Sequence, residues 1–381
     1  MIGVGTQAQM GIRMGQSDYT GAKTALISGL IGLIFFTVTA TIEVNIFADE
    51  IAVFLGADNL LLPLSTKYIY GLMPWLAGIG FQLFFDYTLK ALGHPRFAMM
   101  IMIGTIVLNI ASSVIFVSYF DMGTFGTGLG TGISFTLGAV VSGCVIVKQL
   151  RNNTGLSNAH GRFSLKTFSH LFYNGSSEGL TEIATGVIVY LFNITLMKYV
   201  GPAGVAAFTL VDYLVFFGTS IILGISNGMI PIISYNWGAR YMQRVKSIVR
   251  LALISNLLCG LIMIFLLWTC GRVAIELFIN SSESEVVNFA IRGAKFMSLV
   301  FIFNGFNIFA ASFFTAIDKP GLSLVVASLR GPVLLVAGIL FLPRWFGVDG
   351  IWLSMPLADA VTTIFVFYLL IQGKKYLFEN I

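Results

Sequence analysis

Long apolar segments recur along the whole chain and are separated by short polar connections. We place them at roughly 22–46, 63–88, 97–120, 125–149, 170–198, 204–234, 248–272, 289–315, 321–343 and 349–371. About 20 apolar residues suffice for a helix to cross a bilayer, and these runs lack the alternating hydropathy of barrel strands. Only 10% of the residues are charged, against about 25% in soluble domains. The sequence therefore predicts an all-α integral membrane protein with about ten transmembrane helices.

The basic residues are unevenly divided between alternate connections. Most Lys and Arg residues lie in one set, which includes the connections near 90–96, 148–166 and 240–250. By the positive-inside rule this set faces the cytoplasm. An even number of spans then places the C-terminus in the cytoplasm as well. The net charge of +5 is spread over these short loops, so we read it as an orientation signal and expect no nucleic-acid partner.

Three weak matches at nearly one offset indicate an internal repeat. GQSDYTGAK at 15–23 answers GARYMQRVK at 238–246, ALGHPR at 91–96 answers AIDKPG at 316–321, and Gly123 with Gly126 answers Gly347 with Gly350. Matched loops fall on the same side of the predicted membrane, so the two halves should have the same orientation. Parallel repeats of this kind hold a substrate cavity between the halves, near the midplane.

The repeat also predicts the domain organisation. We expect an N-terminal lobe at 1–150, a polar cytoplasmic linker at 151–168 and a C-terminal lobe at 169–381. Four predicted spans precede the linker and six follow it, so about ten of an expected twelve are present. The expectation is that the first helix and most of the second are missing before the first lobe.

Five stretches of the chain resemble the MATE (multidrug and toxin extrusion) family, nearest its bacterial MepA-like branch. They are GVGTQAQMGIRMGQSDYTGA, LKALGHPRFAMM, ISNGMIPIISYNWGARYMQRV, FTAIDKPGLS and GVDGIWLSMPLADAVT. The resemblance implies a two-lobe helical bundle with its lobes in a V. It also implies a monomeric antiporter of the bacterial cytoplasmic membrane, which exports small amphiphilic or cationic compounds in exchange for protons or sodium ions.

The helix after the linker carries the strongest candidate site. Glu178, Thr181, Glu182 and Thr185 follow the i, i+3, i+4, i+7 spacing of one helix face. Ionisable groups inside a span are costly and usually functional, so this stripe should face a water-filled cavity and bind a cation or proton there. The alternative for Glu178 is an ordinary acid at the start of a helix, in the headgroup zone.

Four more charged residues lie in or near spans, and each has a structural alternative. Asp86 could pair with Lys90 one turn away, and Asp212 could cap its helix locally. Asp359 lies mid-span in the last helix, beside Pro356, where the resembled family often has an acid. Arg330 could snorkel to the surface or partner carbonyls freed by Pro332.

The resemblance also implies a cation site in the N-terminal lobe. Asn109 and Thr131 match its amide and hydroxyl positions, but Ser113 occupies the position of an Asp. The site therefore lacks its carboxylates, and Glu178 with Glu182 become the preferred coupling groups, followed by Asp359.

Other function classes are less well supported by the sequence. A flippase for lipid-linked precursors would need a strongly basic cavity, and only Arg330 lies mid-span. An inactive, truncated transporter is a further alternative. No His lies mid-span, the three Cys form no ligand cluster, and no GxxxxGK[ST] motif occurs. We therefore expect no enzymatic activity and no cofactor, with energy supplied by an ion gradient.

Overall fold

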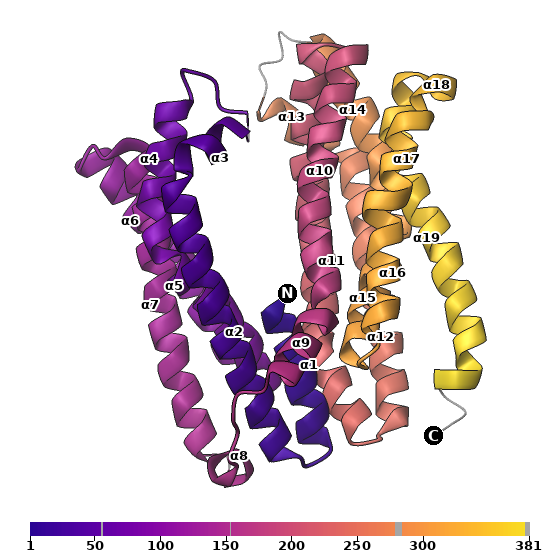
Figure 1. Cartoon of the computed structure of the whole chain (residues 1–381). Coiled ribbons are helices and arrows are strands. Elements are labelled where there is room, and N and C mark those ends of the chain that lie inside the picture. Colours follow the sequence, from indigo (N-terminus) through magenta and orange to yellow (C-terminus); the bar gives the residue numbers. More distant parts are fainter. Residues whose placement is uncertain (55, 153, 279–283, 378–381) are drawn as a thin grey trace. The chain divides into compact units, whose positions relative to one another are not determined.

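The computed structural model describes residues 1–54, 56–152, 154–278 and 284–377. These residues form helices joined by short connections and contain no strand, which confirms the all-α prediction. They group into two compact units (Figure 1). The N-terminal unit holds Met1–Gly175 with Gly238–Arg240, and the C-terminal unit holds Ser176–Trp237 with Tyr241–Ile381. The residues predicted as a linker, 151–168, thus group with the N-terminal unit.

The N-terminal unit contains nine α-helices, of which the first is short and largely buried. They are α1 (Ile2–Gly15), α2 (Tyr19–Ile46), α3 (Ala48–Phe54), α4 (Leu62–Leu72), α5 (Leu76–Ala91), α6 (Pro95–Val114), α7 (Gly123–Asn152), α8 (Thr154–Asn158) and α9 (Leu165–Asn174). A 3-10 turn, η1 (Met73–Trp75), joins α4 to α5, and a wide π turn, η2 (Ile115–Tyr119), extends α6. Asp18 caps α2 by accepting a hydrogen bond from the Gly21 amide at 2.8 Å.

The C-terminal unit contains the remaining helices. They are α10 (Ser176–Tyr199), α11 (Pro202–Gly238), α12 (Met242–Thr269), α13 (Gly271–Glu276), α14 (Ser284–Ser298), α15 (Asn304–Ala316), α16 (Pro320–Ser328), α17 (Leu334–Phe341), α18 (Pro343–Phe346) and α19 (Val348–Leu377). The 3-10 turn η3 (Leu299–Ile302) joins α14 to α15, and the π turn η4 (Leu329–Val333) joins α16 to α17.

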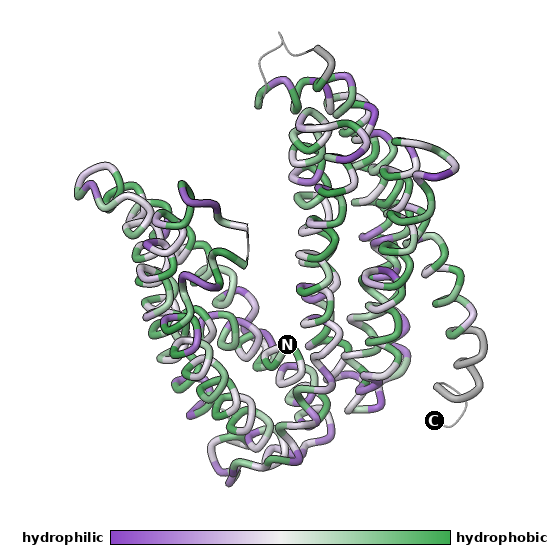
Figure 2. The backbone as a smooth tube through the Cα atoms, turned by 45° about the horizontal axis from the view of Figure 1, so that its top comes forward, coloured by the Kyte–Doolittle hydropathy of each residue, from purple (hydrophilic) through white to green (hydrophobic). Residues whose placement is uncertain are grey.

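Nine helices of the described residues are long and apolar enough to cross a membrane, or ten if one bent pair forms a single span. That pair, Val286–Ile302 and Asn304–Ala316, bends by 42°. The sequence predicted one straight segment there. Figure 2 shows hydrophobic residues along most of each long helix, with hydrophilic residues mainly in the connections. The predicted number of spans, about ten, is confirmed.

The internal repeat is visible in the helix boundaries. α2 and α12 have the same length, and both ends of α12 lie 223 residues after those of α2. α7 and α19 also have the same length, at an offset of 225 residues. The 3-10 turns η1 and η3 interrupt the corresponding span in each half. The two halves therefore repeat one order of helices and breaks.

The matched loops also share an uncommon backbone conformation. Ser17 and Arg240 have φ of 61° and 60°, and Gly93 and Asp318 have φ of 83° and 61°. Gly123 and Gly347 form a third pair with positive φ. Non-glycine residues seldom adopt positive φ, so its recurrence at matched positions supports the repeat independently of residue identity.

Tight helix contacts in the N-terminal unit depend on glycine. A Cβ atom at Gly128 of α7 would lie 2.5 Å from the carbonyl oxygen of Tyr68, and one at Gly71 would lie 2.4 Å from that of Phe125. The backbones of α4 and α7 can approach this closely only because both positions lack a side chain.

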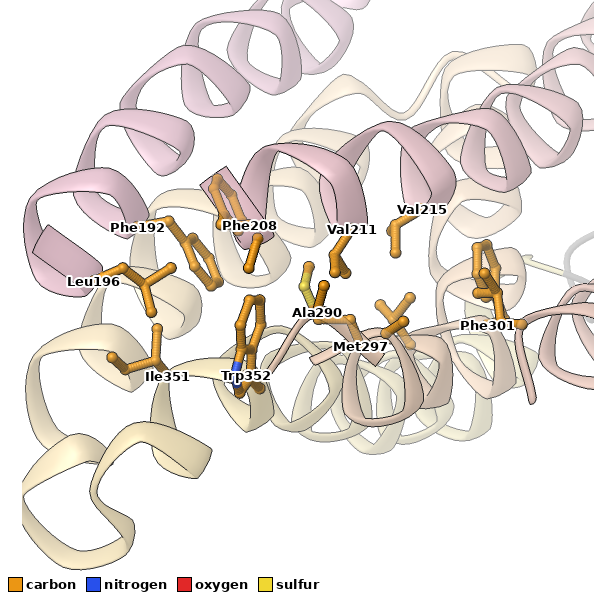
Figure 3. Packing of buried hydrophobic residues seen from close by; sticks show 14 of the residues in the cluster. Phe192, Leu196, Phe208, Val211, Val215, Ala290, Met297, Phe301, Ile351 and Trp352 are labelled. Carbon is orange, nitrogen blue, oxygen red and sulfur yellow. The ribbon is translucent and has the colours of Figure 1, made fainter. Parts of the chain in front are cut away.

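Aromatic and aliphatic side chains fill the core of the C-terminal unit (Figure 3). The Phe192 and Phe208 rings stack with centroids 4.6 Å apart and nearly parallel planes. Trp352 of α19 is fully buried beside Phe208 and Phe289. This cluster joins α10, α11, α14 and α19, the helices from which much of the candidate site is built.

Candidate functional site

A pocket of about 150 Å³ lies inside the C-terminal unit. Its walls come from α10, α11, η4 and α19, with apolar contributions from neighbouring helices. Seven of its lining residues are polar or charged: Thr181, Glu182, Thr185, Asp212, Thr219, Arg330 and Asp359. Six of these seven are residues that the sequence singled out, and Thr219 is the exception.

The α10 stripe contributes three of its four members to this pocket. Thr181 donates to the Ser177 carbonyl and Thr185 to the Thr181 carbonyl, both at 2.9 Å. These hydroxyl protons are therefore engaged by their own helix, and the oxygens can still accept. Glu182 is exposed and lines the pocket.

Glu178, the fourth member, does not line the pocket. Its Oε1 accepts a hydrogen bond from Asn227 Nδ2 at 3.2 Å, and Asn227 Oδ1 accepts from Ser312 Oγ at 3.0 Å. These contacts tie α10 to α11 and α15. Glu178 is partly buried and lies one helical turn from the pocket carboxylate Glu182.

Arg330 and Asp359 form an ion pair inside the unit. Arg330 Nε lies 3.3 Å from Asp359 Oδ1, and both side chains are largely buried. The same carboxylate oxygen accepts from Asn307 Nδ2 at 2.8 Å. Thr363 in turn donates to Asn307 Oδ1 at 3.0 Å. A buried ion pair is stable only when hydrogen bonds satisfy its remaining polar atoms, and this one has two such partners.

The other two carboxylates of the pocket have no such partner. Within the described residues, neither Glu182 nor Asp212 forms an ion pair or a side-chain hydrogen bond. The pocket thus holds three carboxylates and one guanidinium, and the guanidinium is engaged by Asp359. If all these groups are ionised, the pocket has a surplus of negative charge that a proton or a monovalent cation would relieve.

The candidate residues of the N-terminal unit lie apart from this pocket. Asn109 Nδ2 donates to Thr131 Oγ1 at 2.9 Å, so the structure brings this predicted pair together. Asp86 is buried and pairs with Lys90 at 2.5 Å, which is the alternative that the sequence offered for it. None of these residues lines a pocket with a second carboxylate.

Several site residues were not singled out in the sequence. Asn227, Asn307, Ser312, Thr219 and Thr363 all hold or neighbour the charged groups. The available signal was a polar side chain within an apolar span, which in a membrane usually faces protein or water. Asn307 was noted only because it was not an acid, although its amide meets the buried carboxylate directly.

Comparison with known proteins gives consistent matches over most of the chain. The family model described as MatE matches residues 1–115 and 180–339. The multidrug export protein MepA of Staphylococcus aureus (strain MSSA476) is 24% identical over 97% of this chain and 81% of its own length. MepA of Staphylococcus saprophyticus is 25% identical over the same shares.

The fold also matches solved structures of this family. A crystal structure of MATE in complex with MaL6 superposes with a TM-score of 0.89 at 20% identity. The match covers 96% of this chain and 82% of that one. Because the family model matches well over half of the residues, the chain belongs to the MatE family of transporters.

Proposed function

We propose that this protein exports small amphiphilic, mainly cationic compounds in exchange for inward movement of protons or sodium ions, by alternating access. The supporting observation is the pair of carboxylates, Glu182 and Asp212, that face one pocket without a cationic partner. Such groups are expensive inside a membrane and are retained where an ion or proton is bound. The relatives named multidrug export proteins support the substrate class.

The size of the pocket favours a coupling site over a drug site. At about 150 Å³ it has room for a few water molecules, each of which occupies about 30 Å³ in the liquid. Drug-sized ligands need pockets of about 300–1,000 Å³. The pocket therefore suits a proton carried on a carboxylate or a partly hydrated sodium ion, and the exported compound binds elsewhere.

The charge of the site disfavours a flippase for pyrophosphate-linked precursors. A pyrophosphate group needs several uncompensated cations, and Arg330 is the only cation that lines this pocket. Its guanidinium is already paired with Asp359. An anionic headgroup would also meet Glu182 and Asp212, which would repel it.

The test is ethidium export from proteoliposomes that contain the full chain, under an imposed proton gradient or an imposed sodium gradient. We expect one of the two gradients to drive export by the wild type. Glu182→Gln and Asp212→Asn should each reduce the initial rate at least about ten-fold, the effect of losing about 1.4 kcal/mol of ion binding. Glu50→Gln, a change at an exposed acid of α3, is the matched control and should match the wild type.

Two results would count against the proposal. Export that both site variants perform at the wild-type rate would remove these carboxylates from coupling. A wild type that moves no dye under either gradient would contradict the antiport itself and favour the inactive alternative.

We also propose a bacterial cytoplasmic-membrane location for a monomer with its C-terminus in the cytoplasm. The distribution of basic loops and the bacterial origin of the relatives support this. A C-terminal tag that proteases reach only after the cells are opened would agree with that orientation, whereas cleavage in intact cells would reverse it.

A further inference from the structure

A second pocket, of about 540 Å³, lies in the C-terminal unit between α12 and α15. These two helices lie side by side (Figure 1). Its walls are almost wholly apolar and include Leu253, Ile254, Phe306 and Phe309, while Lys246 and Arg250 stand at the end where α12 begins. We call it the α12–α15 groove. It shares no residue with the pocket that holds Glu182.

The internal repeat identifies the counterpart of this groove. At an offset of 223 residues, Lys246 corresponds to Lys23 of α2 and Arg250 to Ile27. The chain itself covers that side of α2. Lys23 Nζ donates to the carbonyl oxygens of Leu156 at 3.2 Å and Ala159 at 2.8 Å, both from the segment that includes α8. Leu156 is fully buried in the same cluster.

The counterparts in α12 are more exposed. Leu26 is buried whereas its counterpart Val249 is only half-buried, and Ile27 is half-buried whereas Arg250 is exposed. In the N-terminal unit, an apolar segment fills the surface and its carbonyl oxygens meet the lysine. An occupant of the α12–α15 groove should supply the same two features, an apolar body and electronegative oxygens at the basic end.

We propose that the α12–α15 groove binds an anionic phospholipid, with its acyl chain along the phenylalanines and its phosphate at Arg250 and Lys246. Basic residues at the end of a groove between membrane helices recognise anionic headgroups. Arg250 lies eight residues into α12, and its long side chain can reach back toward the membrane surface. Within the described residues its guanidinium forms no ion pair, which leaves its charge for the phosphate. Fork-shaped guanidinium donors fit phosphate oxygens well.

The repeat supplies the variants that test this. Arg250→Ile installs the residue found at Ile27, and Ala310→Phe installs the residue found at Phe85, filling the apolar part. Arg244→Gln is the matched control, because Arg244 lies on the same helix but contacts Tyr241 and does not line the groove. Arg250→Lys keeps the charge and guards against a variant that merely folds poorly.

The measurement is titration of the purified, delipidated full chain with phosphatidylglycerol or phosphatidylcholine of identical acyl chains, read by native mass spectrometry. We expect the wild type to prefer phosphatidylglycerol. Arg250→Ile should weaken phosphatidylglycerol binding about five-fold and leave phosphatidylcholine binding unchanged. Ala310→Phe should weaken both lipids, and Arg244→Gln and Arg250→Lys should weaken neither.

Three results would overturn the proposal. Equal affinity of the wild type for the two lipids would remove the role of the phosphate. Equal losses in Arg244→Gln and Arg250→Ile would indicate general surface charge and no groove site. Displacement of bound phosphatidylglycerol by ethidium, lost in Ala310→Phe, would assign the groove to the exported compound.

Discussion

Arg330 Nε and Asp359 Oδ1 lie 3.3 Å apart in the interior of the C-terminal unit. Arg330 belongs to the π turn η4 and Asp359 to α19, so the pair joins two spans that are distant in sequence. Neither charge could be kept inside a membrane alone without a large desolvation penalty. The pair therefore fixes both helices and sets the charge of the adjoining pocket.

Breaking this pair should be more harmful than removing both partners. We expect Asp359→Asn or Arg330→Gln to lower the free energy of unfolding by about 3–5 kcal/mol, because each leaves one buried group uncompensated. The double variant should lose less than the sum of the two. Reversible unfolding in mixed micelles gives the coupling energy. The exposed pair Arg272–Glu276, at 2.8 Å in α13, is the control and should couple by only about 0.3–0.5 kcal/mol. Additive losses at Arg330 and Asp359 would contradict the pairing.

Glycine at the α4–α7 contact should be irreplaceable. Gly128→Ala would place a Cβ 2.5 Å from the Tyr68 carbonyl oxygen, so the helices must separate. We expect a loss of about 1–3 kcal/mol in unfolding free energy, typical of overpacking. Gly104→Ala in α6 is the control, because nothing lies within 4 Å of its added Cβ. That variant should be equally or more stable, by up to about 1 kcal/mol. Equal stability of the two variants would refute the close approach.

Trp352 should be a principal contributor to the stability of the C-terminal unit. Trp352→Ala empties a fully buried site beside Phe208 and should lower the unfolding free energy by about 3–5 kcal/mol. Trp345→Ala removes a side chain that is 75% exposed and should change it by less than about 0.5 kcal/mol. Thermal unfolding of both variants measures the difference, and similar midpoints would show that the Figure 3 core is misassigned.

The N-terminal pair should matter less for transport than the pocket carboxylates. Asn109→Ala removes one neutral hydrogen bond of 2.9 Å, worth about 1 kcal/mol, so ethidium export should slow by no more than about five-fold. Thr131→Val removes the other partner and should behave alike. An Asn109→Ala variant as impaired as Glu182→Gln would place coupling in the N-terminal unit.

The membrane spans could be predicted from sequence because lipid imposes a simple requirement. A chain with so few charges must present continuous apolar helices to the bilayer, and their number follows from length alone. The bend before Asn304 was not predictable, because it depends on packing against another helix. Asn256 of α12 donates to the Gly305 carbonyl at 3.2 Å beside this bend, a contact that no local pattern reveals.

The candidate site was predictable where one helix sufficed and not where several meet. The spacing of Thr181, Glu182 and Thr185 on a single face identified three pocket residues. It also grouped Glu178 with them, although the structure shows Glu178 held by Asn227. The partner of Arg330 lies on another helix, so helical periodicity could not identify Asp359. Which polar residues meet across helices is a tertiary property.

The π turn Leu329–Val333 has a consequence for how this chain can be compared with others. Buried positions recur every four residues through it: Ser323, Ala327, Gly331, Leu335 and Ile339. In a regular α-helix such a series drifts by about 40° per turn, and the wider turn absorbs one extra residue that offsets part of this drift. Deleting one residue there would leave a helix long enough to cross the membrane but rotate Leu335 and Ile339 by about 100° from the core. An alignment that places a gap in this stretch would therefore match the length of the span and misassign its face.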